Sequence, residues 1–422
     1  MRRLDATRWA LVGTMIAAFA IAGCGSSETG STGSKSNAEP GVDGNSIKVG
    51  VLHSLSGTMS ISEVSVRDSE LLAIEEINRA GGVLGRPIEP VCYDPAGDTD
   101  AYRTLARRML AEDGVEVVFG CSLSASRKSV LSTVERHNGL LWYPSIYEGF
   151  EYSENIIYTG ATLNQNVFAL ADYLLQEHGS RIFLIGSDYI YPRESNRVMR
   201  DLIEAKGGTI VGELYAALDA DDAAHAAMIA AIRDAAPDAV FSTVVGRGAE
   251  RLYRGYAESG IDRARCPIAS LTLAEGQIRA IGPAHCTGHV LAAPYFGALP
   301  GEENRRFVAA FQARFGTERP TSMWSETAYA QVHLFARALA EAGTLDAERL
   351  GAAALRQRLA APEGELAFDG ETRHIWLTPG IGVARADGQF DVVWRARRPV
   401  RPDPYLAWSR FETNWLEEGL AA

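Results

Sequence analysis

Hydroxyl side chains gather where three apolar runs of the sequence end. They are Ser122 and Ser124 after VEVVFG, Tyr143 and Ser145 after LLW, and Tyr189 and Tyr191 after RIFLIG. Because hydroxyl oxygens both donate and accept hydrogen bonds, this set suits an uncharged polar ligand. We expect the tyrosines to enclose a small flat molecule; tyrosines that only pack an interface are the alternative. Ser124 could also cap the helix that follows it.

Sequence motifs of catalysis and of phosphate binding are absent. There is no GxGxxG after an expected strand, no GxxxxGK[ST], no HExxH and no GxSxG, and the eight histidines lack ligand spacing. Cys121 could be imagined as a nucleophile, but its neighbourhood supplies no fixed histidine or lysine partner. The sequence therefore predicts a protein that is not an enzyme and holds neither cofactor nor metal; an amide hydrolase is the least favoured alternative.

The N-terminus has the features of an export signal. Basic residues precede an apolar run from Leu11 to Ala22, which is short for a membrane span but typical of a signal peptide. Cys24 follows directly after Ile-Ala-Gly and resembles the lipidated cysteine of a bacterial lipobox; a chance cysteine is the alternative. We expect a signal peptide at 1–23, a flexible tether at 24–46, and a protein anchored outside the cytoplasm by lipid on Cys24.

Export changes how the other cysteines are interpreted. Cys266 and Cys286 each precede an apolar run, and if those runs are neighbouring parallel strands, a disulfide could join their starts. Cys92 and Cys121 end successive expected strands, so we expect them to be buried apolar fillers. No CxxC pair indicates zinc.

The elements that must position these residues alternate between strand and helix. From Ile47 onward, apolar runs such as IKVGVL and DAVFSTVV are separated by amphipathic stretches such as 63–80 and 194–206. Continuous apolar strands spaced by such helices predict an α/β fold with parallel sheets covered on both faces. The runs are too numerous for one small sheet, so we expect two doubly wound lobes with a ligand cleft between them.

Length and charge are consistent with two lobes. In the chain of 422 residues we expect an N-terminal lobe from 47–160 and 296–360, a C-terminal lobe from 161–295 and 361–405, and a tail from 406–422. The formal net charge of −12 argues against binding to nucleic acid. Only the N-terminal run is apolar over a long stretch, which argues against a polytopic membrane protein.

Several strings resemble one family of binding proteins. VLHSLSGTMSIS at 51–62, GCSLSASRKSVL at 120–131, SDYIYPRESN at 187–196 and RPDPY at 401–405 are similar to periplasmic binding proteins of the urea and short-chain-amide branch. These belong to the leucine-binding type of the type I periplasmic-binding fold. Two subfamilies share the strings: lipoprotein receptors of ABC transporters, and a cytoplasmic amide sensor that restrains an antiterminator of amidase expression. SDYIYPRESN is closest to the sensor, whereas HSLSGTM and the lipobox are closest to the receptors.

The resemblance implies a ligand site made by the six hydroxyl residues named above. This chain has Ser122 where the sensor carries an aromatic residue, which should widen the pocket or admit water, and Ser145 where the sensor carries threonine. None of the six is charged, although Asp188 and Glu148 lie close in sequence. Serine hydroxyls would donate to a carbonyl and phenol oxygens would accept from N–H groups.

The expected function follows from the resemblance and the lipobox together. We expect a lipid-anchored solute-binding protein that captures urea or a short-chain amide by cleft closure and delivers it to the permease of an ABC transporter. An amide-sensing negative regulator of amidase expression is the alternative.

Overall fold

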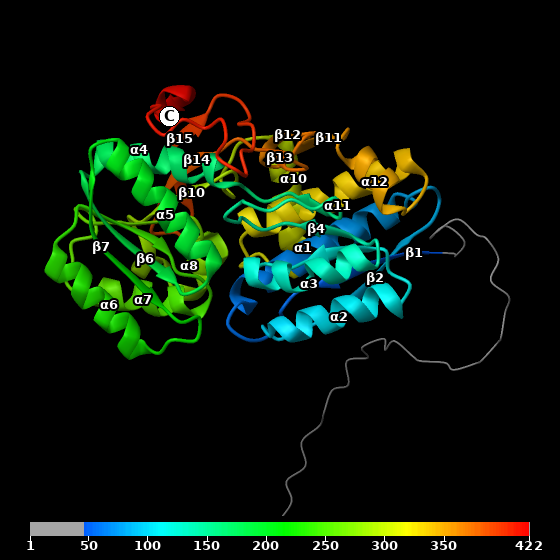
Figure 1. Cartoon of the computed structure of the whole chain (residues 1–422), viewed down its shortest axis with the longest axis horizontal. Helices are drawn as coiled ribbons and strands as arrows, with labels where there is room; N and C mark the ends of the chain where they lie inside the picture. The colour runs from blue at the N-terminus through cyan, green and yellow to red at the C-terminus, as the bar shows by residue number, and fades with distance from the viewer. Residues whose placement is uncertain (1–45, 422) are drawn as a thin grey trace, which may run out of the picture. The chain divides into compact units, whose positions relative to one another are not determined.

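The computed structural model describes residues 46–421, and its elements are labelled in Figure 1. The expected signal peptide, Cys24 and all but the last residue of the expected tether lie outside the described residues. Within the described part of the chain, no helix is long and apolar enough to cross a membrane.

The first sheet is parallel and has the strand order β2-β1-β3-β4-β5. Its strands are β1 (Ile47–Leu52), β2 (Ile88–Tyr93), β3 (Val117–Gly120), β4 (Leu140–Tyr143) and β5 (Ile156–Tyr158). Successive residues of a strand point to opposite faces, and both faces of this sheet are buried. Val117 and Phe119 therefore enter one core, while Val118 enters the other.

Helices cover both faces of the first sheet. They are α1 (Ser60–Arg79), α2 (Thr99–Ala111), α3 (Ser124–Arg136), α10 (Glu302–Phe315), α11 (Met323–Ala342) and α12 (Ala347–Ala354). Helices α2 and α3 pack together on one face, and α1 packs against α11 on the other. Helices far apart in the sequence thus complete one layer, as the blue α1 and yellow α11 in Figure 1 show.

The second sheet has the order β16-β15-β14-β10-β9-β8-β6-β7. Its parallel strands are β6 (Arg181–Ser187), β7 (Thr209–Ala216), β8 (Ala239–Thr243), β9 (Ile268–Ser270) and β10 (Val290–Ala293). Its antiparallel strands are β14 (Gly380–Ala384), β15 (Phe390–Ala396) and β16 (Gly419–Ala421). The expected tail therefore contributes a strand to this sheet.

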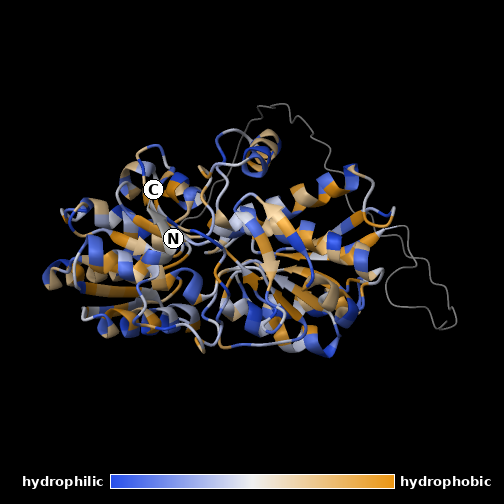
Figure 2. Ribbon diagram, turned by 90° about the horizontal axis from the view of Figure 1, so that it is seen from above, coloured by the Kyte–Doolittle hydropathy of each residue, from blue (hydrophilic) through white to orange (hydrophobic). Residues whose placement is uncertain are grey.

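The helices beside the second sheet come from the middle of the chain. They are α4 (Val167–Glu177), α5 (Ile190–Ala205), α6 (Asp222–Ala235), α7 (Arg247–Glu258), α8 (Glu275–Ile281) and α9 (Pro283–Cys286), with short 3₁₀ helices η1 (Leu163–Gln165) and η2 (Trp415–Glu418). Figure 2 shows orange strands between helices whose outer sides are largely blue. This is the pattern expected for parallel strands buried on both faces.

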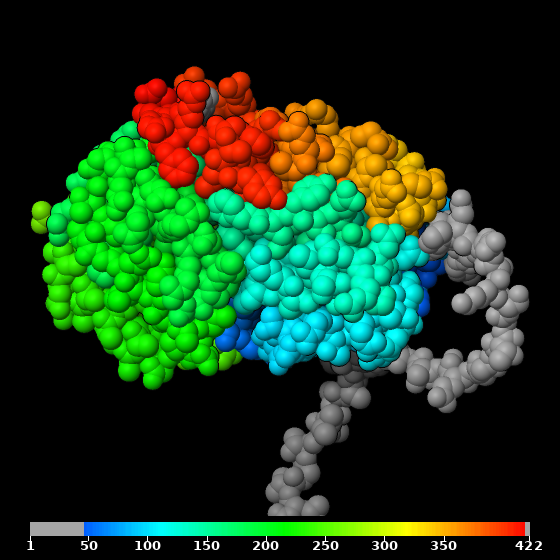
Figure 3. Space-filling view, in the orientation of Figure 1, coloured from blue at the N-terminus to red at the C-terminus, as the bar shows by residue number. Residues whose placement is uncertain are grey.

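A third, small antiparallel sheet joins the first one. Strands β11 (Arg358–Ala361), β12 (Gly364–Phe368) and β13 (Ile375–Trp376) form it. Phe368 packs edge-on against Trp142 of β4, with ring centroids 6.1 Å apart. Residues 361–376, which the sequence assigns to the C-terminal lobe, thus lie against the first sheet, and the segment joins the second sheet only from β14. In Figure 3 the yellow and orange residues lie against the cyan part and the red residues over the green part.

Two helices differ from expectation for identifiable reasons. Helix α5 begins at Ile190 rather than 194, because Pro192 lies in its first turn, where the missing N–H is not needed. Tyr189 is therefore its N-cap residue, and Tyr191 lies in the helix rather than in a strand-end loop. Helix α4 has no counterpart in the prediction, since its sequence VFALADYLLQE is too uniformly apolar to show a clear helical period.

The cysteines correct two expectations. Cys266 and Cys286 are free thiols, so the possible disulfide is not formed. Cys286 ends α9 and lies four residues before β10, while Tyr256 donates a hydrogen bond to the Cys266 sulfur at 3.2 Å. Burial raises the pKa of both thiols, which keeps them protonated. Cys92 is exposed and Cys121 is buried, so the expectation of buried fillers is wrong for the first and confirmed for the second.

Candidate functional site

A small cavity lies between residues of the first and second sheets. The centre of a water-sized sphere can occupy only ≈ 30 Å³ of it, which is room for about two water molecules. Both sheets contribute to the lining, which consists of Met59, Ser62, Ser122, Leu123, Ser124, Ser145, Ile146, Tyr189, Tyr191, Val245, Gly246, Ala249, Thr272, Gln277 and Trp324. None of these fifteen side chains is charged.

Five of the six predicted ligand residues line this cavity together. They are Ser122, Ser124, Ser145, Tyr189 and Tyr191. The sixth, Tyr143, is fully buried behind the lining and donates a hydrogen bond to the Ser122 carbonyl oxygen at 3.1 Å. Tyr143 therefore supports the loop that carries Ser122 and does not line the cavity.

The turn after β3 places Ser122 and Ser124 in the cavity wall. Cys121 has φ = 66°, a left-handed conformation that swings the chain from the strand into helix α3. Leu123 is the N-cap residue, and Ser124 is the first residue of the helix. The alternative role of Ser124, capping this helix, is therefore wrong. Its hydroxyl instead donates to Oε2 of the buried Glu148 carboxylate at 2.5 Å.

The second sheet supplies the phenols. Tyr189 and Tyr191 lie at the start of helix α5, directly after β6. Burial raises the pKa of both phenols, so they remain protonated and able to donate hydrogen bonds. The Oη of Tyr191 is buried near the Ser195 hydroxyl, but no described residue forms a short hydrogen bond with it.

Gln277 and Trp324 belong to the lining but not to the predicted site. Gln277 of α8 donates from Nε2 to the Ser62 hydroxyl of α1 at 2.8 Å, a bond that joins elements of the two sheets. Its Oε1 and the Trp324 Nε1 are buried without a hydrogen-bond partner among the described residues. Both residues lie in the first turns of helices, α8 and α11. The sequence prediction considered only residues that directly follow strands, so it missed Gln277 and Trp324.

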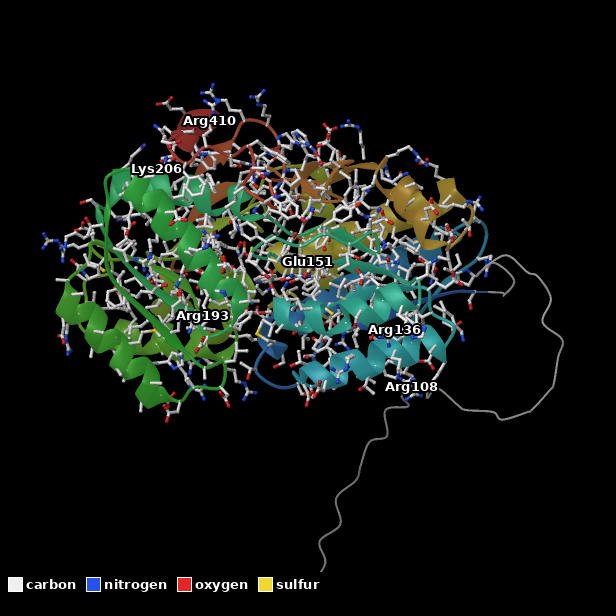
Figure 4. The ribbon with its side chains drawn as sticks, viewed as in Figure 1. Arg108, Arg136, Glu151, Arg193, Lys206 and Arg410 are labelled. Atoms are coloured by element: carbon white, nitrogen blue, oxygen red, sulfur yellow. The ribbon has the colours of Figure 1, made fainter. Side chains whose placement is uncertain are left out.

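A buried cluster of charges stands behind the serines. Arg127, which is fully buried, donates from Nε to Glu151 at 2.6 Å and from Nη2 to Glu148 at 3.4 Å. Lys128 also bonds Glu151, at 2.9 Å. Burial raises the pKa of the Glu151 carboxyl, but the Arg127 guanidinium outweighs this effect and the net pKa lies below its ordinary value. Figure 4 labels Glu151 close to helix α3.

The charges of this cluster balance one another. Two cations, Arg127 and Lys128, face two carboxylates, Glu148 and Glu151. The Arg127 guanidinium also lies 4.8 Å from the ring centre of Tyr143, the residue behind the cavity wall. No net charge is left over for a ligand to neutralise.

Cys121 does not have the environment of a nucleophile. It is fully buried, and burial together with the Glu63 charge raises the pKa of its thiol. Its side chain is absent from the cavity lining. Among residues 46–421, no group of histidine, cysteine and carboxylate side chains is arranged to hold a metal ion.

The fold matches those of proteins that bind small solutes. A solute-binding protein of an ABC transporter from Rhodopseudomonas palustris, solved with 3,4-dihydroxybenzoic acid, has a TM-score of 0.75 at 24% identity over 82% of this chain and 95% of its own. A branched-chain amino acid transporter substrate-binding protein from Streptococcus pneumoniae, solved with isoleucine, has a TM-score of 0.74 at 18% identity over 85% of this chain and 100% of its own. At these identities the likeness concerns the fold alone.

Relatives are also detected by sequence. The leucine-, isoleucine-, valine-, threonine- and alanine-binding protein of Pseudomonas aeruginosa is 25% identical over 76% of this chain and 86% of its own length. A limonene hydroxylase from Geobacillus stearothermophilus is 25% identical over 126 residues, and the chain spans only 23% of its length. Residues 47–410 match the family described as the periplasmic binding protein domain, which is nearly all of the described chain. The chain therefore belongs to the periplasmic binding protein family and is a binding protein, not an enzyme.

Proposed function

We propose that this solute-binding protein captures urea or a short primary amide and delivers it to the permease of an ABC transporter. The observation that carries the proposal is a small enclosed cavity with an uncharged polar lining. Its charge, its size and its unpaired polar atoms each support a small neutral amide.

Charge argues against the ligands of the solved relatives. Isoleucine and 3,4-dihydroxybenzoic acid, named in two of them, both carry a carboxylate at neutral pH. A buried carboxylate needs a cation or several donors, since leaving it unpaired is costly. The nearest buried cation, Arg127, is already held by Glu148 and Glu151. A neutral ligand avoids this cost.

Size argues in the same direction. With ≈ 30 Å³ open to the centre of a water-sized sphere, the cavity suits urea, formamide or acetamide better than an amino acid with a branched side chain. A ligand with so few atoms offers at most about 1.5 kcal/mol of binding free energy per atom, so each hydrogen bond counts.

The unpaired atoms of the lining match an amide. Trp324 Nε1 can only donate, Gln277 Oε1 can only accept, and Tyr191 Oη can do both. A primary amide or urea presents a carbonyl acceptor and N–H donors in one plane. Such a ligand would satisfy polar groups that are buried without partners, each of which otherwise costs about 1–3 kcal/mol.

Calorimetry with a ligand series tests the proposal. We expect urea, formamide or acetamide to release heat on titration, with isoleucine and 3,4-dihydroxybenzoate giving none. Tight binding of either carboxylate, with no response to any amide, would contradict it.

The anchor and the partner belong to the same proposal. Lipid on Cys24 would keep the receptor beside its permease, whereas the amide-sensing regulator needs no anchor. Incorporation of labelled palmitate into the wild type but not into Cys24→Ala is expected; absence of label from both would favour the regulator.

A further inference from the structure

One hydroxyl in the cavity wall already has its only hydrogen engaged. Ser124 Oγ donates to Glu148 Oε2 at 2.5 Å and accepts from Arg127 Nη1 at 3.3 Å. A serine hydroxyl has one hydrogen and two lone pairs. One lone pair therefore remains free, and toward the cavity Ser124 can accept a hydrogen bond but cannot donate one.

Buried charges fix this arrangement. Glu148 is 2% exposed, and its Oε2 accepts the hydrogen bond that the Ser124 hydroxyl donates. Its other oxygen, Oε1, is held by Arg127 Nη2 at 3.4 Å. Arg127 in turn is held by Glu151. Rotation of the Ser124 hydroxyl toward the cavity would break the bond to Glu148 with no replacement.

The lining therefore has a defined polarity. Ser124 offers an acceptor, and Trp324 Nε1 offers a donor that is unpaired among the described residues. An amide meets both, with its N–H at Ser124 and its carbonyl oxygen at Trp324. A carboxylate of the same shape brings an oxygen lone pair against that of Ser124.

We infer that Glu148, which does not line the cavity, is a specificity-determining residue that holds Ser124 as an acceptor and so selects amides over carboxylates. The inference rests on the proposed function and deepens it. The negative charge of Glu148 also acts on the cavity wall: burial, and after it this charge, raise the pKa of Tyr191.

Acetamide and acetate provide the test, because they differ mainly in replacing NH₂ by O⁻. Arg127 holds the Oε1 side of residue 148, so in Glu148→Gln the amide nitrogen faces Ser124 and donates to it. The Ser124 hydrogen is then free to point into the cavity. We expect calorimetry to show acetamide binding weakened about tenfold and the acetamide-to-acetate affinity ratio reduced about a hundredfold.

Glu151→Gln is the matched control. It removes a carboxylate from the same guanidinium but leaves the bond between Ser124 and Glu148 in place. Its affinity ratio should stay within about threefold of the wild type. An unchanged ratio in Glu148→Gln, or an equal fall in Glu151→Gln, would overturn the inference.

Ser124→Ala decides the matter if Glu148→Gln fails to fold. It removes the acceptor and the Ser124 bonds to Glu148 and Arg127 but keeps all the buried charges, so acetamide should bind about tenfold more weakly and acetate should stay excluded. Unchanged acetamide affinity would overturn the inference. A wild type that binds neither urea nor any short amide would refute the proposed function itself, an outcome distinct from an unchanged ratio.

Discussion

At the scale of single residues, a weakly bonded hydroxyl can separate ligand binding from stability. Tyr191 Oη is buried with the Ser195 hydroxyl as a weak partner, so the unliganded protein gains little from it. Tyr191→Phe keeps the ring and removes only this oxygen. We expect calorimetric affinity for acetamide or urea to fall about tenfold, while the thermal midpoint of the unliganded protein stays the same or rises slightly.

Tyr253→Phe is the control for that change. Its hydroxyl is likewise buried with a weak partner, the Ser270 hydroxyl, but it does not line the cavity. Ligand affinity should be unchanged in this variant. If both variants bound the ligand as the wild type does, Tyr191 would have no place in the site.

At the same scale, the sequence predicted only part of the candidate site. The hydroxyl residues at the strand ends and the family resemblance together predicted five residues that line the cavity. They could not predict that Tyr143 stands behind the wall, nor that Glu148 takes the Ser124 hydrogen. An acidic residue in a loop is usually solvated, and only the fold shows that Arg127 is buried beside it.

At the scale of elements, the connection from β10 to α10 passes from the second sheet to helices of the first. Glu275, the first residue of α8, accepts a hydrogen bond from the Gly297 backbone N–H in this connection at 2.7 Å. Its other carboxyl oxygen is unpaired among the described residues. Burial raises the pKa of Glu275 from 4.5 to about 7. The neutral carboxyl is therefore the form that the fold favours.

This pKa predicts how stability depends on pH. Between pH 4.5 and about 7 the folded protein binds more protons at Glu275 than the unfolded chain does, so stability falls as pH rises. The full loss above pH 7 is about 3 kcal/mol. Glu275→Gln should be more stable than the wild type at pH 8 and show a flatter profile, measured by unfolding in guanidinium chloride, since urea is a proposed ligand.

Part of the slope should remain in that variant, because burial also raises the pKa of Glu363 to about 7. Glu318→Gln, at an exposed carboxylate, should follow the wild-type profile. A Glu275→Gln profile as steep as that of the wild type would show that this carboxyl ionises normally.

Helices and strands were predicted well where the hydrophobic pattern of the sequence was clear. Alternation of apolar runs and amphipathic stretches located most helices and all parallel strands of both sheets except the short β5. Helix α4 was missed because burial on nearly all sides removes the helical period. Residues 361–376 were assigned to the C-terminal lobe but pack against the first sheet, because the sequence does not show on which surface a hairpin packs.

At the scale of the whole molecule, segments that belong to the two sheets lie in close contact beside the cavity. Gly246, before α7 of the second sheet, has φ = 62°, and the next residue, Arg247, donates its backbone N–H to the Thr58 carbonyl oxygen before α1 at 3.2 Å. A Cβ on Gly246 would lie 2.8 Å from that oxygen, closer than real side chains come. The bond between Gln277 and Ser62 closes the same interface. Glycine at 246 is therefore required by this contact, and we expect the contact to form when the two sheets close over a ligand.

Gly246→Ala should accordingly block closure. We expect affinity for the amide ligand to fall at least about tenfold, and the unliganded thermal midpoint to fall only modestly, since a non-glycine residue at positive φ costs about 1–2 kcal/mol. Small-angle scattering should show contraction of the wild type on ligand addition and none in the variant. Gly276→Ala is the control, because a Cβ there meets nothing within 4 Å. Wild-type affinity in Gly246→Ala would mean that ligand binding does not depend on this contact, and that the cavity fills without the two sheets approaching as closely as they do here.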